Sequence, residues 1–232
     1  MEFISLGGGL NSVAMLLLLR DDGNDAEAVF ADHRSDWPET YEYLDYLAGH
    51  GYEVTRLDTG DLYEYFWRKA NIPMRFQRWC TRDFKTQPLH SYMRDKSGGE
   101  WVTYIGFAAG EEHRAARGRE AAGESKQYPL IDRGITRAGC EEIIRAHGLE
   151  LPMKSGCWFC PFQRVGELRH LKRIHPELVC RIRALEDRCN ERIARDKPGM
   201  APFYIKDRPI MSVVEAEQTD LFEEERPCMC NL

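Results

Sequence analysis

The chain has 232 residues, of which 43% are hydrophobic, 30% charged and 11% aromatic. This composition excludes collagen, a coiled coil and a wholly disordered chain, and the length suits one domain with an appendage. The 32 Lys and Arg residues against 38 Asp and Glu give a formal charge of −6. That balance excludes a uniformly basic coat for nucleic acid, but it leaves room for one basic face.

The longest apolar run, Val13 to Leu19, is shorter than the roughly 20 residues that a membrane-spanning helix needs. No positively charged segment precedes it, as a signal peptide would require. We therefore expect a cytoplasmic protein without a membrane partner. The chain has eight cysteines. Because a reducing compartment disfavours disulfides, metal ligation, sulfur chemistry and burial remain as explanations for them.

The first half of the chain alternates between strand and helix patterns. Residues 2–6 predict a buried strand, followed by the glycine turn Gly7-Gly8-Gly9 and a helix over 13–19. Later elements are expected as a strand at 27–31, a helix from Pro38 to about Gly51, and strands at 52–57 and 101–107. Strands separated by helices predict an α/β fold with a mostly parallel sheet.

The second half is helical in pattern, with helices expected at 137–147 and 165–195. We place a boundary near residue 135, between a sheet domain at 1–135 and a helical, cysteine-containing region at 136–232 that packs on it. The tail from Glu215 onward is acidic and ends in Cys228-Met229-Cys230.

Two segments of this acidic chain are basic. Residues 68–96 carry eight basic residues against two acidic ones, a net +6, and residues 164–197 carry ten against six, a net +4. Such segments predict a face that binds a polyanion, with solvated mixed-charge helices as the alternative. The first segment favours polyanion contact because its acidic residues are sparse.

The glycine turn lies where a buried strand passes into a helix. Glycines there let backbone N–H groups point into one concavity, and the helix N-terminus adds positive potential for a phosphate. The turn has neither the lysine of a P-loop nor G-x-G-x-x-G spacing. On these residues alone, a tight structural turn explains the glycines nearly as well as nucleotide binding does.

Further residues extend the pattern into a family resemblance. The run Ser5 to Ser12, S-L-G-G-G-L-N-S, resembles the PP-loop S-G-G-x-D-S of ATP pyrophosphatases, with Gly7 and Asn11 in place of the usual Ser and Asp. Four later stretches are similar to segments of phosphoadenylyl-sulfate (PAPS) reductases: Asp32 to Thr40, the R-x-C-x4-K-x2-P run from Arg78 to Pro88, Gly106 with Glu111, Glu112 and Arg114, and Tyr128-Pro129-Leu130.

The resemblance implies a five-stranded, mostly parallel sheet with helices on both faces, of the adenine nucleotide α-hydrolase type. It implies ATP at the carboxyl ends of the strands, attack on the α-phosphorus, release of pyrophosphate and a Mg²⁺ ion. The nucleotide would be held by Ser5, Gly7, Gly8, Gly9, Asn11, Ser12, Asp32 and Gly106. Asp32, Lys85 and Arg78 would carry catalysis. Because Asn11 removes a carboxylate, Asp32, Asp36, Glu111 and Glu112 are candidate substitutes at the metal.

Cys157-Trp158-Phe159-Cys160-Pro161 is a C-x-x-C segment. Its spacing lets two thiolates chelate one metal centre, although a redox dithiol has the same spacing. The resemblance adds Cys80, which matches a cluster ligand of APS reductases, and implies an iron–sulfur cluster of the 4Fe–4S type. Either Cys228 or Cys230 supplies the fourth ligand, or three cysteines hold the cluster and leave one iron open. Zinc is the alternative metal.

Together these features predict an ATP pyrophosphatase that adenylylates a nucleic-acid oxygen for replacement by sulfur. The most specific version is the ATP pyrophosphatase of a DNA phosphorothioation system, with a cysteine desulfurase as sulfur donor; tRNA thiolation is a close variant. Two alternatives stay open at this point. One is a PAPS or APS reductase that uses a tail cysteine, and the other is a nucleotide-binding sensor without catalysis.

Overall fold

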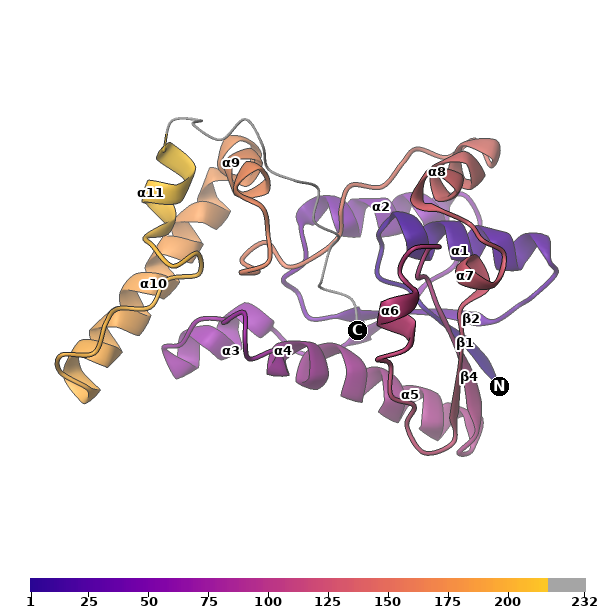
Figure 1. Cartoon of the computed structure of the whole chain (residues 1–232), viewed down its shortest axis with the longest axis horizontal. Coiled ribbons are helices and arrows are strands. Elements are labelled where there is room, and N and C mark those ends of the chain that lie inside the picture. Colours follow the sequence, from indigo (N-terminus) through magenta and orange to yellow (C-terminus); the bar gives the residue numbers. More distant parts are fainter. Residues whose placement is uncertain (217–232) are drawn as a thin grey trace. The chain divides into compact units, whose positions relative to one another are not determined.

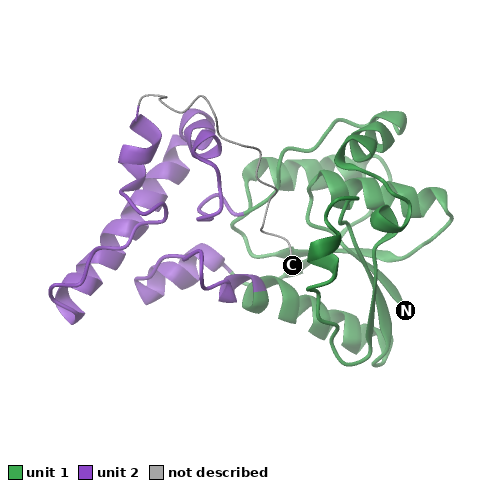
Figure 2. Cartoon of the chain, in the orientation of Figure 1, with its two compact units in different colours: residues 1–60, 82–156, 232 green, residues 61–81, 157–231 purple. Residues whose placement is uncertain are grey.

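The computed structural model describes residues 1–216, which form two compact units. Within that range unit 1 comprises residues 1–60 and 82–156, and unit 2 comprises residues 61–81 and 157–216 (Figure 2). The divisions between the two units do not coincide with the boundary that we expected near residue 135. Helix α8 (Arg137–Ala146) packs on α1 (Leu10–Asp21), so residues 136–156 belong with the sheet.

Unit 1 is built on a five-stranded sheet in the order β3-β2-β1-β4-β5, with every pair parallel (Figure 1). The strands are β1 (Glu2–Ser5), β2 (Glu27–Asp32), β3 (Thr55–Asp58), β4 (Trp101–Ile105) and β5 (Glu124–Gln127). The parallel α/β sheet is confirmed, with four strands where the sequence predicts them. Residue patterns did not predict β5, because its residues E-S-K-Q carry no apolar alternation and it lies at the sheet edge.

Helices cover both faces of this sheet, as expected. On one face, Ile4 and Phe30 pack with α1, α2 (Pro38–Gly49) and α8. On the other, the neighbouring residues Phe3 and Val29 pack with Met93 and Trp101 against α5 (Gln87–Ser97). Because successive strand residues face opposite sides of a sheet, the run Phe3-Ile4 serves both layers and is fully buried.

Each unit contains further helical segments. Unit 1 also contains the π-helical segment η1 (Arg82–Thr86), α6 (Glu112–Ala115) and α7 (Pro129–Asp132). Unit 2 contains α3 (Leu62–Lys69), α4 (Trp79–Thr81), α9 (Val165–Ile174), α10 (Pro176–Asp196) and α11 (Ile210–Glu215). The single helix expected over 165–195 is two helices. Pro176 begins the second, because proline has no N–H for an intrahelical bond and restricts the preceding residue, His175.

The long helix α10 is the spine of unit 2. Its buried side chains include Ile182, Leu185 and Cys189. Between them the carboxylate of Glu186 accepts hydrogen bonds from the backbone N–H groups of Ile205, at 3.0 Å, and Ile210, at 2.9 Å. This buried carboxylate ties the segment before α11 to α10. No helix in the described part of the chain is both long and apolar enough to cross a membrane.

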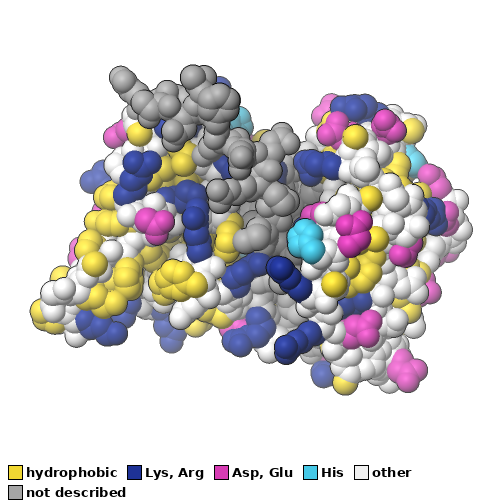
Figure 3. Space-filling view, viewed as in Figure 1, with side chains coloured by type: hydrophobic (Ala, Val, Ile, Leu, Met, Phe, Trp, Pro, Cys, Tyr) yellow, Lys and Arg dark blue, Asp and Glu magenta, His cyan; other side chains and the backbone are white. Residues whose placement is uncertain are grey.

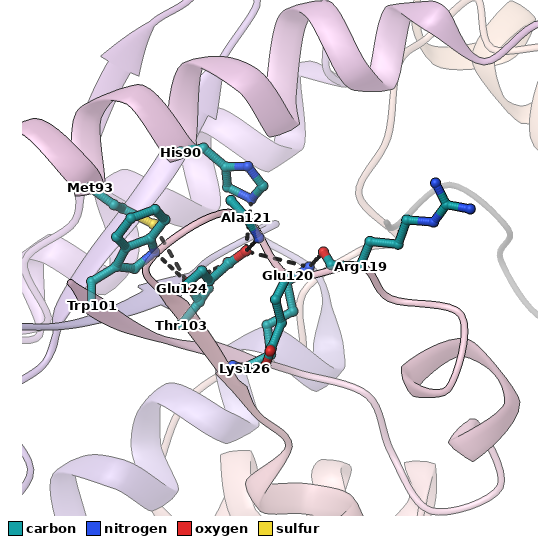
Figure 4. Close-up of polar contacts among 9 residues, drawn as sticks. All are labelled: His90, Met93, Trp101, Thr103, Arg119, Glu120, Ala121, Glu124 and Lys126. Atoms are coloured by element: carbon teal, nitrogen blue, oxygen red, sulfur yellow. Dashed lines mark hydrogen bonds and ion pairs between the residues drawn. The ribbon is translucent and has the colours of Figure 1, made fainter. Parts of the chain in front are cut away.

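A buried carboxylate also secures the polar edge strand. Glu124 on β5 accepts hydrogen bonds from the Thr103 hydroxyl at 2.8 Å and from the Ala121 N–H at 2.9 Å, and His90 Nε2 lies 3.3 Å from its Oε2 (Figure 4). Burial alone would raise the pKa of Glu124. The contacts with His90, Ala121 and Thr103 outweigh that effect and lower the pKa to about 2.

We predict that Glu124→Gln lowers the free energy of unfolding at neutral pH by about 2–3 kcal/mol, because the ionised carboxylate is favoured in the folded state. Its folded pKa lies below the unfolded value, so the contribution is fully present above about pH 5 and is lost as the pH falls toward 2. Denaturant unfolding of both proteins from pH 3 to 7 measures the difference, which should shrink as acid is added. Exposed Glu100→Gln is the matched control; a gap independent of pH would contradict the assignment.

Candidate functional site

The glycine turn lies at the centre of the sheet, at the carboxyl end of β1. Ser5 is in register with Val29 of β2 and Ile105 of β4, and the strand order reverses at β1. In open α/β sheets, ligands bind outside the carboxyl ends of the strands at such a reversal. The predicted turn therefore occupies the position where this fold places a ligand.

The turn holds itself in shape by its own hydrogen bonds. The Gly7 N–H donates to the Ser12 hydroxyl at 3.2 Å, and that hydroxyl donates to the Gly9 carbonyl at 2.9 Å. Gly8 has φ +69°, a conformation that favours glycine. Gly9 is the N-cap of α1, and no side chain among residues 1–216 caps the helix. A helix N-terminus without a side-chain cap is suited to an anion such as a phosphate.

Three glycines allow close packing around this turn. A Cβ on Gly106 would lie 2.9 Å from Ser12 Cα and 3.0 Å from the Asn11 carbonyl carbon. A Cβ on Gly8 would lie 2.8 Å from Thr40 Cγ2, and one on Gly9 would lie 2.8 Å from Ser155 Oγ. The structure thereby brings Gly106 to the loop, and its expected part in nucleotide binding stays a prediction. It also places Ser155 there, which no sequence signal identified, because that residue lies in a polar stretch far along the chain.

The unusual Asn11 has a physical explanation in Glu111. The Asn11 amide nitrogen donates to Glu111 Oε2 at 2.9 Å, and the Ala108 N–H donates to the same oxygen at 3.0 Å. Arg114 pairs with the other Glu111 oxygen and lies over the Phe107 ring at 4.3 Å. An Asp at position 11 would bring two carboxylates together. Within the described residues the buried Asn11 Oδ1 has no hydrogen-bond partner.

Asp32 ends β2 and shapes the turn that follows it. Its Oδ1 accepts hydrogen bonds from the Arg34 N–H at 2.8 Å and the Tyr41 hydroxyl at 3.1 Å. Burial, together with the nearby Asp36 and Asp32 carboxylates, raises the pKa of Tyr41, so the phenol stays a neutral donor. At least one oxygen of Asp32 therefore serves the local turn.

A second buried carboxylate, Asp36, lies between His33 and Lys85. His33 Nε2 is 3.3 Å from Asp36 Oδ2, and Lys85 Nζ is 3.6 Å from Oδ1. Burial lowers the pKa of His33 and outweighs the attraction of Asp36, so the imidazole is neutral at pH 7. In the described part of the chain neither Asp36 oxygen accepts a hydrogen bond. Asp36 and Asn11 thus offer unused oxygen acceptors, the ligand type that Mg²⁺ prefers.

The three described cysteines of the expected centre belong to unit 2. In the described part of the chain Cys80, Cys157 and Cys160 form no disulfide, and each is partly exposed. The Cys160 N–H donates to the Cys157 carbonyl at 3.1 Å, which closes the C-x-x-C turn, and Gln163 Nε2 donates to the same carbonyl. Cys228 and Cys230, the candidates for a fourth ligand, lie outside the described residues.

Neighbours of Cys80 pack with neighbours of the C-x-x-C turn. The Phe66 ring contacts Trp79, with centroids 5.0 Å apart, and Phe159, with centroids 5.8 Å apart. The Arg78 guanidinium lies over the Phe162 ring at 5.3 Å. Residues adjacent to Cys80 and residues within or just after the turn thus share one aromatic cluster. Sulfur ligands on two such segments suit a soft or borderline metal.

The predicted site residues therefore divide between the two units. The loop residues, Asp32, Gly106 and Lys85 all belong to unit 1, whereas Arg78 and the three cysteines belong to unit 2. In unit 1 the structure brings Ser5, Asn11 and Gly106 to one strand end, together with Glu111 and Ser155.

Comparisons with known proteins agree with this geometry. Residues 2–117 match the model of the phosphoadenosine phosphosulfate reductase domain. The chain therefore belongs to that family of enzymes acting on nucleotides. A phosphoadenylyl-sulfate (PAPS) reductase from Candida auris, solved as a phosphate complex, has the same fold, with a TM-score of 0.51 and 15% identity over 68% of this chain and 81% of that one.

Two curated relatives from Methanocaldococcus jannaschii also match. The uncharacterized protein MJ0066 is 24% identical over 75% of this chain, and the uncharacterized protein MJ0973 is 23% identical over 75% of it. The chain spans only 39% and 44% of their respective lengths.

We predict that Gly106→Ala weakens ATP binding at least about tenfold and lowers the free energy of unfolding by about 1–3 kcal/mol. The added methyl group meets backbone atoms of Asn11 and Ser12 that cannot move without shifting the loop. Isothermal titration with ATP and denaturant unfolding measure the two effects. Gly49→Ala is the control, since its Cβ meets nothing within 4 Å. Unchanged ATP affinity in Gly106→Ala would remove the loop from the nucleotide site.

Proposed function

We propose that this protein is an ATP pyrophosphatase that adenylylates an oxygen of a nucleic acid so that sulfur can replace it. The observation that carries the proposal is the uncapped first turn of α1 behind a glycine turn at the sheet reversal, in a member of a nucleotide-enzyme family. The same chain carries three thiols on two packed segments, which supplies a reason for sulfur chemistry.

The proposed reaction has two displacements. A nucleic-acid oxygen attacks the α-phosphorus of ATP, a new P–O bond forms, and the bond to the β-phosphate oxygen breaks to release pyrophosphate. A sulfur nucleophile then attacks the activated centre, and the original oxygen leaves with AMP. Negative charge grows on the leaving pyrophosphate, where the first-turn N–H groups of α1 and the Lys85 ammonium would stabilise it. A Mg²⁺ ion would use the open oxygens of Asn11 and Asp36.

Cys80, Cys157 and Cys160, with Cys228 or Cys230 as a fourth ligand, would hold a 4Fe–4S cluster, with zinc as the alternative metal. With only three cysteine ligands, such a cluster would leave one iron open to carry sulfide. With a fourth cysteine ligand no iron is open, and a persulfide would carry the sulfur instead. Cys157 directly follows Gly156 in the sequence, and within unit 1 the Gly156 carbonyl accepts the Trp37 N–H at 3.1 Å. The sulfur itself would come from a cysteine desulfurase, with a thiol as the reductant.

Nucleic acid fits the charge distribution of an otherwise acidic protein. On the side of Figure 3 that carries α3, α9 and α10, Lys and Arg side chains are prominent and acidic ones are sparse. Phosphate contacts of this kind give affinity that falls as salt rises. We favour DNA phosphorothioation over tRNA thiolation as the specific version, and the acceptor experiment decides between them.

We predict that anaerobically reconstituted protein releases pyrophosphate from ATP when DNA or tRNA is added, and that Lys85→Ala slows this release about a hundredfold or more. A coupled pyrophosphate assay with each acceptor measures the rates. Lys96→Ala is the matched control. Lys96 is a surface lysine of α5 that pairs with Glu27, and it is not one of the proposed site residues. If no acceptor leads to pyrophosphate release, the proposal is wrong. If the protein instead forms sulfite from PAPS, it is a reductase.

We predict that the anaerobically purified protein binds iron and sulfide, and that Cys80→Ser loses most of both. The reason is that a serine hydroxyl replaces one thiolate ligand. Metal and sulfide analysis with an absorption spectrum measures the loss, and the exposed Cys180→Ser is the control. If the purified protein is colourless and contains zinc, zinc is the bound metal. If Cys80→Ser keeps its full metal content, Cys80 is not a ligand.

A further inference from the structure

A tight turn in unit 2 presents an aromatic ring to solvent. Met74 and Gln77 form an isolated antiparallel bridge, and the Gln77 N–H donates to the Met74 carbonyl at 3.3 Å. Between them Phe76 is 83% exposed, more than any other large hydrophobic residue of the described chain. Other rings of this segment are packed: Tyr63 and Phe66 are buried, and the Trp79 ring contacts Phe66 in a tilted arrangement.

A single exposed phenylalanine is common on protein surfaces and needs a second observation to carry meaning. Here both flanking arginines are fixed. Arg75 Nε donates to the Pro161 carbonyl at 3.2 Å, and the Arg78 guanidinium lies over the Phe162 ring. Pro161 and Phe162 directly follow Cys160. Phe76 is therefore carried on a turn whose two sides are attached to the end of the C-x-x-C segment.

Basic residues predominate in the sequence around Phe76, and the nearest acidic residues, Glu64 and Asp83, pair with Arg68 and Arg82. From Tyr65 to Arg82 the sequence has five basic residues and no acidic one. Four of the five, Arg68, Lys69, Arg75 and Arg82, are exposed. A partner protein that bound Phe76 in an apolar pocket would not require this excess of cations around it. A single-stranded nucleic acid satisfies both features, since its phosphates pair with the cations and its bases offer flat apolar faces.

We propose that Phe76 stacks on an unpaired base of a nucleic acid and so holds that strand beside the cysteines of unit 2. The inference rests on the proposed function in taking nucleic acid as the substrate, and it adds the residue and the single-stranded form. Stacking on an aromatic side chain tolerates any base, so Phe76 would position the strand without reading its sequence. The neighbouring arginines and lysines would supply the salt-dependent part of the affinity.

Fluorescence anisotropy tests this with fluorescein-labelled oligothymidylate, a mixed-sequence duplex and the full-length protein. We expect tighter binding to the single strand. Phe76→Ala and Phe76→Leu should both weaken it about tenfold or more, with the salt dependence of binding unchanged. Phe76→Trp should bind as the wild type does, and the new tryptophan's fluorescence should be quenched by the stacked base. Met200→Ala, another exposed apolar side chain of unit 2, should have no effect.

Each outcome of these measurements either supports or overturns the stacking role of Phe76. Wild-type affinity in Phe76→Ala overturns the stacking role while leaving the proposed function in place. Normal binding by Phe76→Leu with weak binding by Phe76→Ala shows a general apolar contact and also overturns it. No binding of either nucleic acid by the wild type overturns this inference together with the nucleic-acid part of the proposed function, whereas pyrophosphate release with another acceptor would still support ATP activation. Variants whose thermal unfolding matches the wild type exclude misfolding as the cause.

Discussion

The contact between Gly106 and the first turn of α1 is the constraint on which the rest of unit 1 depends. β4 adjoins β1 in the sheet, and the chain leaving β4 passes so close to Asn11 and Ser12 that no side chain fits. That approach fixes where α1 begins, and with it the direction of its open N–H groups. The same approach brings Glu111, a few residues farther along, within hydrogen-bond distance of Asn11. A backbone contact thereby sets the electrostatics of the site.

Carboxylates in this protein act in two distinct ways. Glu111, Glu124 and Glu186 are saturated by N–H groups, a hydroxyl or an arginine, and each fastens a neighbouring segment to its unit. Asp36 is different, because it is buried beside a neutral His33 and the Lys85 ammonium and accepts no hydrogen bond from the described residues. This difference in hydrogen bonding separates Asp36 from the three structural glutamates.

Much of this architecture could be predicted from the sequence, and the exceptions have physical causes. The strand that contains Phe3 and Ile4 is buried on both faces, so its sequence is an apolar run that predicts a strand. β5 was missed because an edge strand can be polar, and the break at Pro176 was overlooked inside a long amphipathic pattern. Ser155 was missed because its place beside Gly9 depends on tertiary packing, which leaves no local signal. The roles assigned to Asp32, Lys85, Arg78 and the cysteines remain predictions.

Unit 2 is assembled from two stretches of chain separated by residues 82–156 of unit 1, which include β4 and β5. Residues 61–81 leave the ribosome early, yet the Tyr63 ring also packs against Trp158 and Phe159, and the Phe66 ring also packs against Phe159. During synthesis these aromatic groups lack those partners until the later stretch emerges, whereas α1, α2 and the first strands can already begin to pack on one another. Nascent chains that stall before residue 157 would display an unpaired apolar surface, and this interval is when the protein would depend most on chaperones.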